Sequence, residues 1–207
     1  MIDDIFKTVL SLSQGSISEQ RSKFISILIP VKTVEDVKGE VEKYRKQYYD
    51  ARHVCWAYVL GTDRLLFRSN DDGEPASTAG KPILGAINSH ELTDVLIIVI
   101  RYFGGLKLGT SGLTIAYKAA ARDAIANAQI VELTMDDQVG IVFEYPFLNG
   151  VMRVIKEEKP QILDQKFDMD CTMSLQIRKS MMEQLKNRLL KVDTLKIIKK
   201  EADIHEV

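Results

Sequence analysis

The feature that most constrains the fold is an apolar run that leads into a glycine-rich loop and then into a helical pattern. Residues 95–100, Val-Leu-Ile-Ile-Val-Ile, contain no polar side chain, which is typical of a strand buried on both faces of a sheet. Residues 101–112 follow with four glycines, one arginine and one lysine. From Leu113 onward, apolar and small residues recur at helical spacing, and the many alanines predict very close packing onto a sheet. We therefore expect a buried strand, a tight loop and the N-terminus of a helix in succession.

The glycine loop combines the residue types that bind anions in proteins. Glycines permit close backbone approach, and the N–H groups at a helix N-terminus suit phosphate when cations stand beside them. We expect Thr110 or Ser111 to cap the helix. The candidate anion- or RNA-binding residues are Arg101, Tyr102, Gly104, Gly105, Lys107, Gly109, Thr110 and Ser111. In this hypothesis the two cations supply charge, and the backbone of Gly104, Gly105 and Gly109 donates hydrogen bonds. The alternative is that the glycines only make a tight strand-to-helix connection.

A second loop, residues 70–82, holds three carboxylates in four residues. Its candidate residues are Asp71, Asp72, Glu74 and Lys81. Three interpretations are open. The carboxylates hold Mg²⁺ or Ca²⁺, although the EF-hand spacing is absent; they pair with Arg101 or Lys107 and so fix two loops together; or they form a solvated turn built on Asp-Gly. We expect neither a metal ion nor a cofactor.

His53 and Cys55 lie two residues apart on a predicted strand and therefore share one face. His90 and His205 are remote and lack zinc-ligand spacing, and this geometry is poor for a Cys–His nucleophile. We predict a buried thiol and a hydrogen-bonded histidine.

Four aromatic residues, Trp56, Tyr58, Tyr102 and Phe103, stand near basic residues. If exposed together, they would form a stacking platform for single-stranded RNA. Alternation places Trp56 and Tyr58 on the strand face opposite His53 and Cys55, and one of the two faces must be core. The sequence does not decide which, so a core position is the default for Trp56.

The patterns elsewhere predict two domains. Residues before 95 are expected to form an amphipathic helix over 2–12, a loop over 14–22, a strand over 24–31, a helix begun by a Thr33–Asp36 capping box, a hairpin of strands 53–60 and 65–68, and a short helix over 82–89. After about residue 132 we expect a strand over 138–145, a helix over 149–159, one or two strands over 162–177, a helix capped by Ser180 with Glu183, and a strand from 195 to 198 or 204. The latter order, strand-helix-strand-strand-helix-strand, is that of a ferredoxin-like domain. We predict an α+β protein with domains 1–131 and 132–207.

Composition limits the class of partner. The chain is 45% hydrophobic and 28% charged, as expected for a soluble globular protein, and no apolar run approaches the roughly 18–20 residues of a membrane span. An acidic N-terminus and two widely separated cysteines favour a cytoplasmic location without membrane contact. Residues 1–132 carry 16 basic and 16 acidic side chains, and residues 133–207 carry 12 and 13. Any nucleic-acid site must therefore be a local patch.

Three segments, in this order and spacing, resemble the Impact/YigZ family. They are Ala-Arg-His-Val-Cys-Trp-Ala-Tyr at 51–58, Ser-Asn-Asp-Asp-Gly-Glu-Pro at 69–75 with Thr-Ala-Gly-Lys-Pro-Ile-Leu at 78–84, and Arg-Tyr-Phe-Gly-Gly-Leu-Lys-Leu-Gly at 101–109. The resemblance implies that the first domain is similar to the second domain of ribosomal protein S5, a fold also found in domain IV of elongation factor G. It implies that the second domain is similar to the last, ferredoxin-like domain of that factor.

The resemblance also implies a role in translation, because eukaryotic relatives regulate translation through a protein partner during amino-acid starvation. We expect a non-enzymatic, cytoplasmic regulatory factor that binds RNA, the ribosome or a translation-related protein through residues 101–112 and 71–75. The alternative is an enzyme acting on a phosphorylated or nucleotide substrate, with a metal at the acidic loop. A third possibility is a module that binds only proteins.

Overall fold

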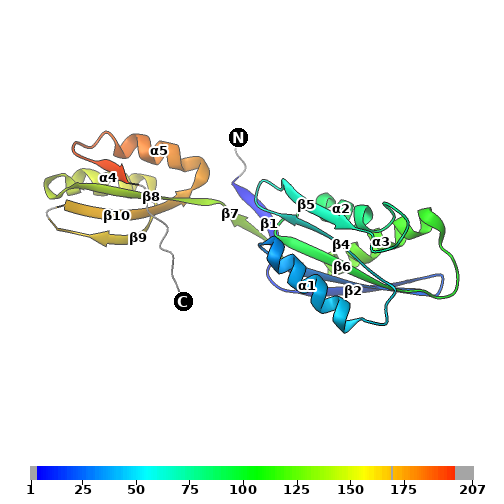
Figure 1. Cartoon of the computed structure of the whole chain (residues 1–207). Helices are drawn as coiled ribbons and strands as arrows, with labels where there is room; N and C mark the ends of the chain where they lie inside the picture. The colour runs from blue at the N-terminus through cyan, green and yellow to red at the C-terminus, as the bar shows by residue number, and fades with distance from the viewer. Residues whose placement is uncertain (1–3, 169, 199–207) are drawn as a thin grey trace. The chain divides into compact units, whose positions relative to one another are not determined.

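The buried strand predicted at residues 95–100 is observed, and it is the central strand of a five-stranded antiparallel sheet (Figure 1). The computed structural model describes residues 4–168 and 170–198. The sheet has the strand order β2 (Ser13–Glu19), β3 (Ser22–Pro30), β6 (Val95–Tyr102), β4 (His53–Leu60) and β5 (Leu66–Asn70). Every neighbouring pair is antiparallel, so the end of β6 lies beside the start of β4.

Helices cover both faces of this sheet. Helix α1 (Val34–Gln47) packs on one face with Val54, Tyr58 and their neighbours, whereas α2 (Gly80–Ser89) and α3 (Gly109–Ala126) pack on the other face with Cys55 and theirs. The predicted capping box of α1 is present. Both faces of β4 are therefore core, where we expected one. Trp56 is partly buried on the α1 face, where its ring stacks on Tyr58 with 5.9 Å between centroids.

The close packing of α3 onto the sheet is confirmed. Its alanines at 116, 120, 121 and 124 are all buried. A Cβ atom at Gly15 of β2 would lie only 2.5 Å from the backbone nitrogen of Ala124. Gly15 therefore permits a backbone approach that no other residue type would allow.

Two predictions for the N-terminal segment were wrong. The helix predicted over 2–12 is not formed by the described residues of that range. Instead β1 (Ile5–Val9) pairs with β7 (Ile130–Thr134), a strand more than 120 positions away that a local pattern does not reveal. Residues 14–22 are not a loop, because the polar strand β2 pairs along its length with β3. The turn between them carries positive φ at both Gln20 and Arg21, where hairpins usually have Asn-Gly or Asp-Gly.

The second compact unit contains residues from Thr134 onward together with Asp4 and Ile5, and the first runs from Phe6 to Leu133. The elements of the second unit are β8 (Asp136–Glu144), the 3₁₀ turn η1 (Tyr145–Phe147), α4 (Leu148–Glu158), β9 (Gln161–Lys166), β10 (Asp170–Arg178), α5 (Lys179–Leu189) and β11 (Lys196–Ile198). They form an antiparallel sheet of order β11-β8-β10-β9, whose core packs against α4 and α5. The predicted succession of strands and helices is observed, and Ile204 lies outside the described residues.

The predicted cap of α5 was wrong. The helix begins at Lys179, and the N-cap residue Arg178 makes no side-chain cap. The Asp4 carboxylate accepts the Ser180 N–H instead, at 3.0 and 3.1 Å.

Along the parts of the chain that the structure describes, no helix is long and apolar enough to span a membrane.

Candidate functional site

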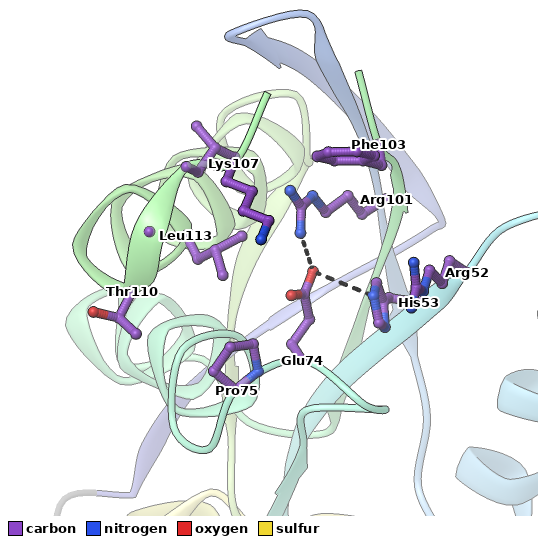
Figure 2. A pocket seen from close by; sticks show the side chains of 11 residues that line it. Arg52, His53, Glu74, Pro75, Arg101, Phe103, Lys107, Thr110 and Leu113 are labelled. Atoms are coloured by element: carbon purple, nitrogen blue, oxygen red, sulfur yellow. Dashed lines mark hydrogen bonds and ion pairs between the residues drawn. The ribbon is translucent and has the colours of Figure 1, made fainter. Parts of the chain in front are cut away.

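A cleft of about 340 Å³ opens where β4 begins, β6 ends and α3 begins (Figure 2). Antiparallel pairing brings these ends together, because His53 of β4 lies opposite Arg101 of β6. The acidic loop supplies the remaining wall. The lining residues are Arg52, His53, Glu74, Pro75, Arg101, Phe103, Lys107, Leu108, Gly109, Thr110 and Leu113.

The cleft carries a surplus of positive charge. Three of its side chains are cationic, Arg52, Arg101 and Lys107, and Glu74 is its single carboxylate. Figure 2 shows the end of the Lys107 side chain turned toward the Glu74–Arg101 pair. Because helix N-termini also attract negative charge, an anion fits this cleft better than a cation.

The N-terminus of α3 has no side-chain cap. Its N-cap residue is Leu108, and Gly109 begins the helix with a φ of +69°. The prediction that Thr110 or Ser111 caps the helix was wrong, because both lie within its first turn. The first amides of α3 therefore have no side-chain acceptor from a capping residue.

A buried polar network forms the floor of the cleft. The Glu74 side chain is 3% exposed, and its Oε1 accepts hydrogen bonds from Arg101 Nη1 at 2.6 Å and from the Tyr117 hydroxyl at 2.8 Å. His53 Nε2 lies 4.0 Å from the same oxygen. This is the loop-to-loop ion pair among the three interpretations of the acidic loop.

Cys55 and Tyr117 extend the network into the core. Cys55 Sγ lies 3.4 Å from the Tyr117 hydroxyl and 3.0 Å from the carbonyl oxygen of Asp71. Burial raises the pKa of the Cys55 thiol and, likewise, the pKa of Tyr117 far above their usual values. Burial therefore favours the thiol form of Cys55 over the thiolate.

His53 has a defined tautomer. Its Nδ1 lies 2.8 Å from the carbonyl oxygen of Asp72. Because a carbonyl only accepts hydrogen bonds, Nδ1 carries a hydrogen, and Nε2 is the nitrogen that faces Glu74. The predicted buried thiol and hydrogen-bonded histidine are both observed.

The other carboxylates of the acidic loop turn away from the cleft. Asp71 accepts the backbone N–H groups of Ser77, Ala79 and Gly80 at 2.8–3.0 Å, which fixes the start of α2. Burial raises the pKa of Asp71, but these hydrogen bonds and the nearby charge of Lys81 outweigh burial, so the net pKa is lower than usual.

Asp72 accepts the Val54 N–H at 2.7 Å and pairs with Arg45 of α1. The three carboxylates thus point in different directions. Within residues 4–168 and 170–198, no three His, Cys, Asp or Glu side chains are placed to hold a metal ion. The alternative of a metal at this loop therefore has no such group of three side chains behind it among the described residues.

Six of the eight glycine-loop candidates divide into two groups, and Gly104 and Tyr102 are described separately below. Arg101, Lys107, Gly109 and Thr110 line the cleft. Gly105 and Ser111 are exposed and do not line it.

Gly104 is not a free donor as predicted, because its N–H is given to Ser22 Oγ at 3.2 Å. A Cβ atom there would overlap the backbone of Arg21, so Gly104 is needed for chain packing.

The predicted aromatic platform is not assembled. Trp56, Tyr58 and Tyr102 belong to the α1 face of the sheet, and only Phe103 lines the cleft. The Tyr102 hydroxyl donates to Asp50 at 2.8 Å, and this hydrogen bond raises the pKa of Tyr102 to about 12.

Sequence reasoning did not name Arg52 as a site residue, and it did not single out Pro75 or Leu108 within the predicted binding segments 71–75 and 101–112. Arg52 immediately precedes β4, so pairing β4 antiparallel to the strand before the glycine loop would have placed it here. His53 was treated as structural, although its ring also borders the cleft.

The fold and the cleft define a two-unit protein of helices and antiparallel sheets, with a basic cleft at the start of a long helix. The family model described as the Impact N-terminal domain matches residues 20–125. An IMPACT family member of Haemophilus influenzae is 32% identical over 192 residues, covering 90% of this chain and 92% of that protein. IMPACT family member YvyE of Bacillus subtilis is 33% identical over 152 residues, covering 73% and 70%. The crystal structure of a hypothetical protein has a TM-score of 0.68 and 26% identity, covering 97% of this chain and all of that one. The chain belongs to the IMPACT family.

Proposed function

We propose that this protein is a non-enzymatic, cytoplasmic factor that regulates translation by binding RNA, the ribosome or a translation-related protein. The chain belongs to the IMPACT family, and the resemblance to that family is what implies a role in translation. The observation that carries the proposal is the convergence of Arg101 and Lys107 with an uncapped helix N-terminus in one cleft. Backbone phosphates of RNA and acidic side chains of a protein are both suited to such a surface.

The finer fold assignments belong to the same proposal. The sheet order β11-β8-β10-β9 with two helices supports a ferredoxin-like domain, similar to the last domain of elongation factor G. The first unit would be similar to the second domain of ribosomal protein S5, and the domain limits would be 1–131 and 132–207. Both cysteines are free and buried, which suits a reducing cytoplasm.

The arrangement of Glu74 supports a binding role over a catalytic one. A general base needs a free lone pair directed at the substrate. Glu74 Oε1 is already occupied by Arg101 and Tyr117, and Asp71 and Asp72 serve the backbone elsewhere. The cleft therefore offers anion contacts, and its one carboxylate is engaged through Oε1 in a buried ion pair.

The test is binding of single-stranded RNA and of ribosomes at several salt concentrations. We expect binding by the wild-type protein to weaken steeply as the salt concentration rises. Lys107→Ala should bind more weakly than wild type at low salt, and it should reduce the slope of log K against log salt by about 0.7. Lys118→Ala is the matched control, since Lys118 is an exposed lysine of α3 that does not line the cleft.

Lys107 is a better probe than Arg101, because Arg101→Ala would also break a buried ion pair. Equal binding by the Lys107 and Lys118 variants would contradict the use of this cleft. No affinity for RNA, ribosomes or translation proteins at low salt would contradict the proposed function as a whole.

A further inference from the structure

We propose that the cleft recognises a phosphate monoester attached to a nucleoside, either as a free mononucleotide or as the phosphorylated end of an RNA strand. This inference rests on the proposed anion-binding role and names the ligand class. Three separate observations support it: the bonding of Arg101, the charge balance of the lining, and the apolar wall beside the cations.

Arg101 is a buried cation whose donors are only partly used. Its side chain is 7% exposed, and Nη1 donates to Glu74. Nε is buried and has no acceptor among the described residues. Nε and Nη2 form one edge of the guanidinium with two parallel N–H groups, a geometry that matches two oxygens of one phosphate. Figure 2 shows the guanidinium directed into the cleft between Glu74 and Phe103. A bound phosphate that reached this edge would satisfy a donor that is otherwise left buried and unpaired.

The charge balance favours a dianion. Three lining cations against one carboxylate leave a surplus of two positive charges. Arg52 and Lys107 take part in no ion pair within the described part of the chain, so both remain available to a ligand. A phosphate monoester carries about −1.5 to −2 charges at pH 7, whereas a carboxylate or an internal phosphodiester carries one. The surplus therefore matches a terminal phosphate better than a peptide carboxylate or the interior of a strand.

The apolar wall suits a nucleoside. Phe103 is half exposed at the rim, and its ring lies 5.6 Å from the guanidinium carbon of Arg101. Pro75, Leu108 and Leu113 complete the apolar surface. Aromatic side chains beside arginine bind nucleobases by stacking. The volume of about 340 Å³ lies near the lower end for small-molecule sites, which suits one nucleotide and not several.

The experiment is calorimetric titration of the full chain at low salt with AMP, 3′,5′-cyclic AMP, adenosine, inorganic phosphate and an N-acetylated peptide with a free carboxylate. We expect AMP to bind at least about tenfold more tightly than the cyclic diester and adenosine. Lys107→Ala should weaken the binding of AMP about tenfold, and Lys118→Ala should leave the affinity for AMP unchanged. Phe103→Ala should weaken AMP about tenfold while leaving inorganic phosphate unchanged.

A second set of titrations separates the two sources of the ligand. Short RNA strands with a 5′-phosphate, a 3′-phosphate or neither are compared with AMP. Tighter binding of a phosphorylated strand than of AMP supports an RNA end, and binding of AMP alone supports a free mononucleotide.

Equal affinity for AMP and the cyclic diester would overturn the inference, as would tighter binding of the peptide carboxylate. If RNA binds equally well with and without a terminal phosphate, the inference fails and the proposed function stands. If no anion binds and there is no affinity for RNA, ribosomes or translation proteins, both fail.

Discussion

Breaking the buried ion pair between Glu74 and Arg101 should destabilise the N-terminal unit strongly. Both side chains are at most 7% exposed, and their atoms lie 2.6 Å apart. Arg101→Met keeps an unbranched stem but leaves the Glu74 carboxylate buried with only Tyr117 as donor. Removing one partner of a buried pair typically costs about 3–5 kcal/mol, because the remaining charge loses its compensation. Glu74→Gln should cost a similar amount for the same reason.

The assay is urea unfolding followed by tryptophan fluorescence. Trp56 is the single tryptophan of the chain and lies on β4, so its emission reports on the unit that contains the pair. With an m-value of about 1–2 kcal/mol/M, a loss of about 4 kcal/mol lowers the midpoint by about 2–4 M. The double variant Arg101→Met/Glu74→Gln leaves no unpaired buried charge. Its loss of unfolding free energy should therefore be smaller than the sum of the two single losses by about 2 kcal/mol or more.

The matched control is Lys43→Met on α1. Lys43 pairs with Glu40 at 2.8 Å, but the Lys43 side chain is 56% exposed. Exposed pairs contribute less than about 1 kcal/mol. Our account of the buried pair is wrong if Arg101→Met lowers the free energy of unfolding no more than Lys43→Met does. It is also wrong if the loss in the double variant equals the sum of the two single losses, because solvent would then compensate the Glu74 charge.

Two further predictions concern the same unit, and a third concerns a cysteine in each unit. At pH 7 Asp71→Ala should lower the free energy of unfolding by about 1–2 kcal/mol, through loss of three backbone hydrogen bonds. Because the pKa of Asp71 is lowered by folding, its contribution is present above the unfolded pKa, and the difference from wild type should shrink as the pH falls below about 4 in acid-titrated urea unfolding. Gly104→Ala should cost about 1–3 kcal/mol in the same assay through overlap with Arg21, and a neutral result would show that the loop relaxes freely. Cys55 and Cys171 are fully buried, so a thiol reagent should label the native protein at least about a hundredfold more slowly than the unfolded chain; rapid native labelling of either would contradict this.

The sequence predicts well those elements in which the order of apolar and polar residues directly reflects which faces are buried. The run at 95–100 is apolar on every side because helices cover both faces of its strand, and the alanine stripe of α3 records its close contact with β2. β1 and β2 fail for the opposite reason. β1 depends on a partner more than 120 residues away, and β2 is a polar strand that pairs along its length with β3.

The candidate site shows the same division. Arg101 and Lys107 were identified because they stand next to the strand and helix that position them. Tyr102 was misplaced because alternation along β6 turns it toward α1, away from its neighbours in sequence. The pairing of Glu74 with Arg101 stayed one interpretation of three, since it depends on the path of a loop that no periodic pattern describes.

Glu74 explains how the cleft can be both stable and attractive to anions. Without a counterion, a guanidinium as buried as Arg101 would destabilise the fold, so a carboxylate is needed even when no ligand is bound. One carboxylate neutralises one cation, and it engages only Nη1 of Arg101. The charges of Arg52 and Lys107 then remain unpaired within the described residues, and the first amides of α3 remain uncapped. The buried pair therefore stabilises the unit, while the remaining cations, which are separate from it, can be varied without unfolding the protein. This separation is why Lys107→Ala tests binding, whereas Arg101→Met tests stability.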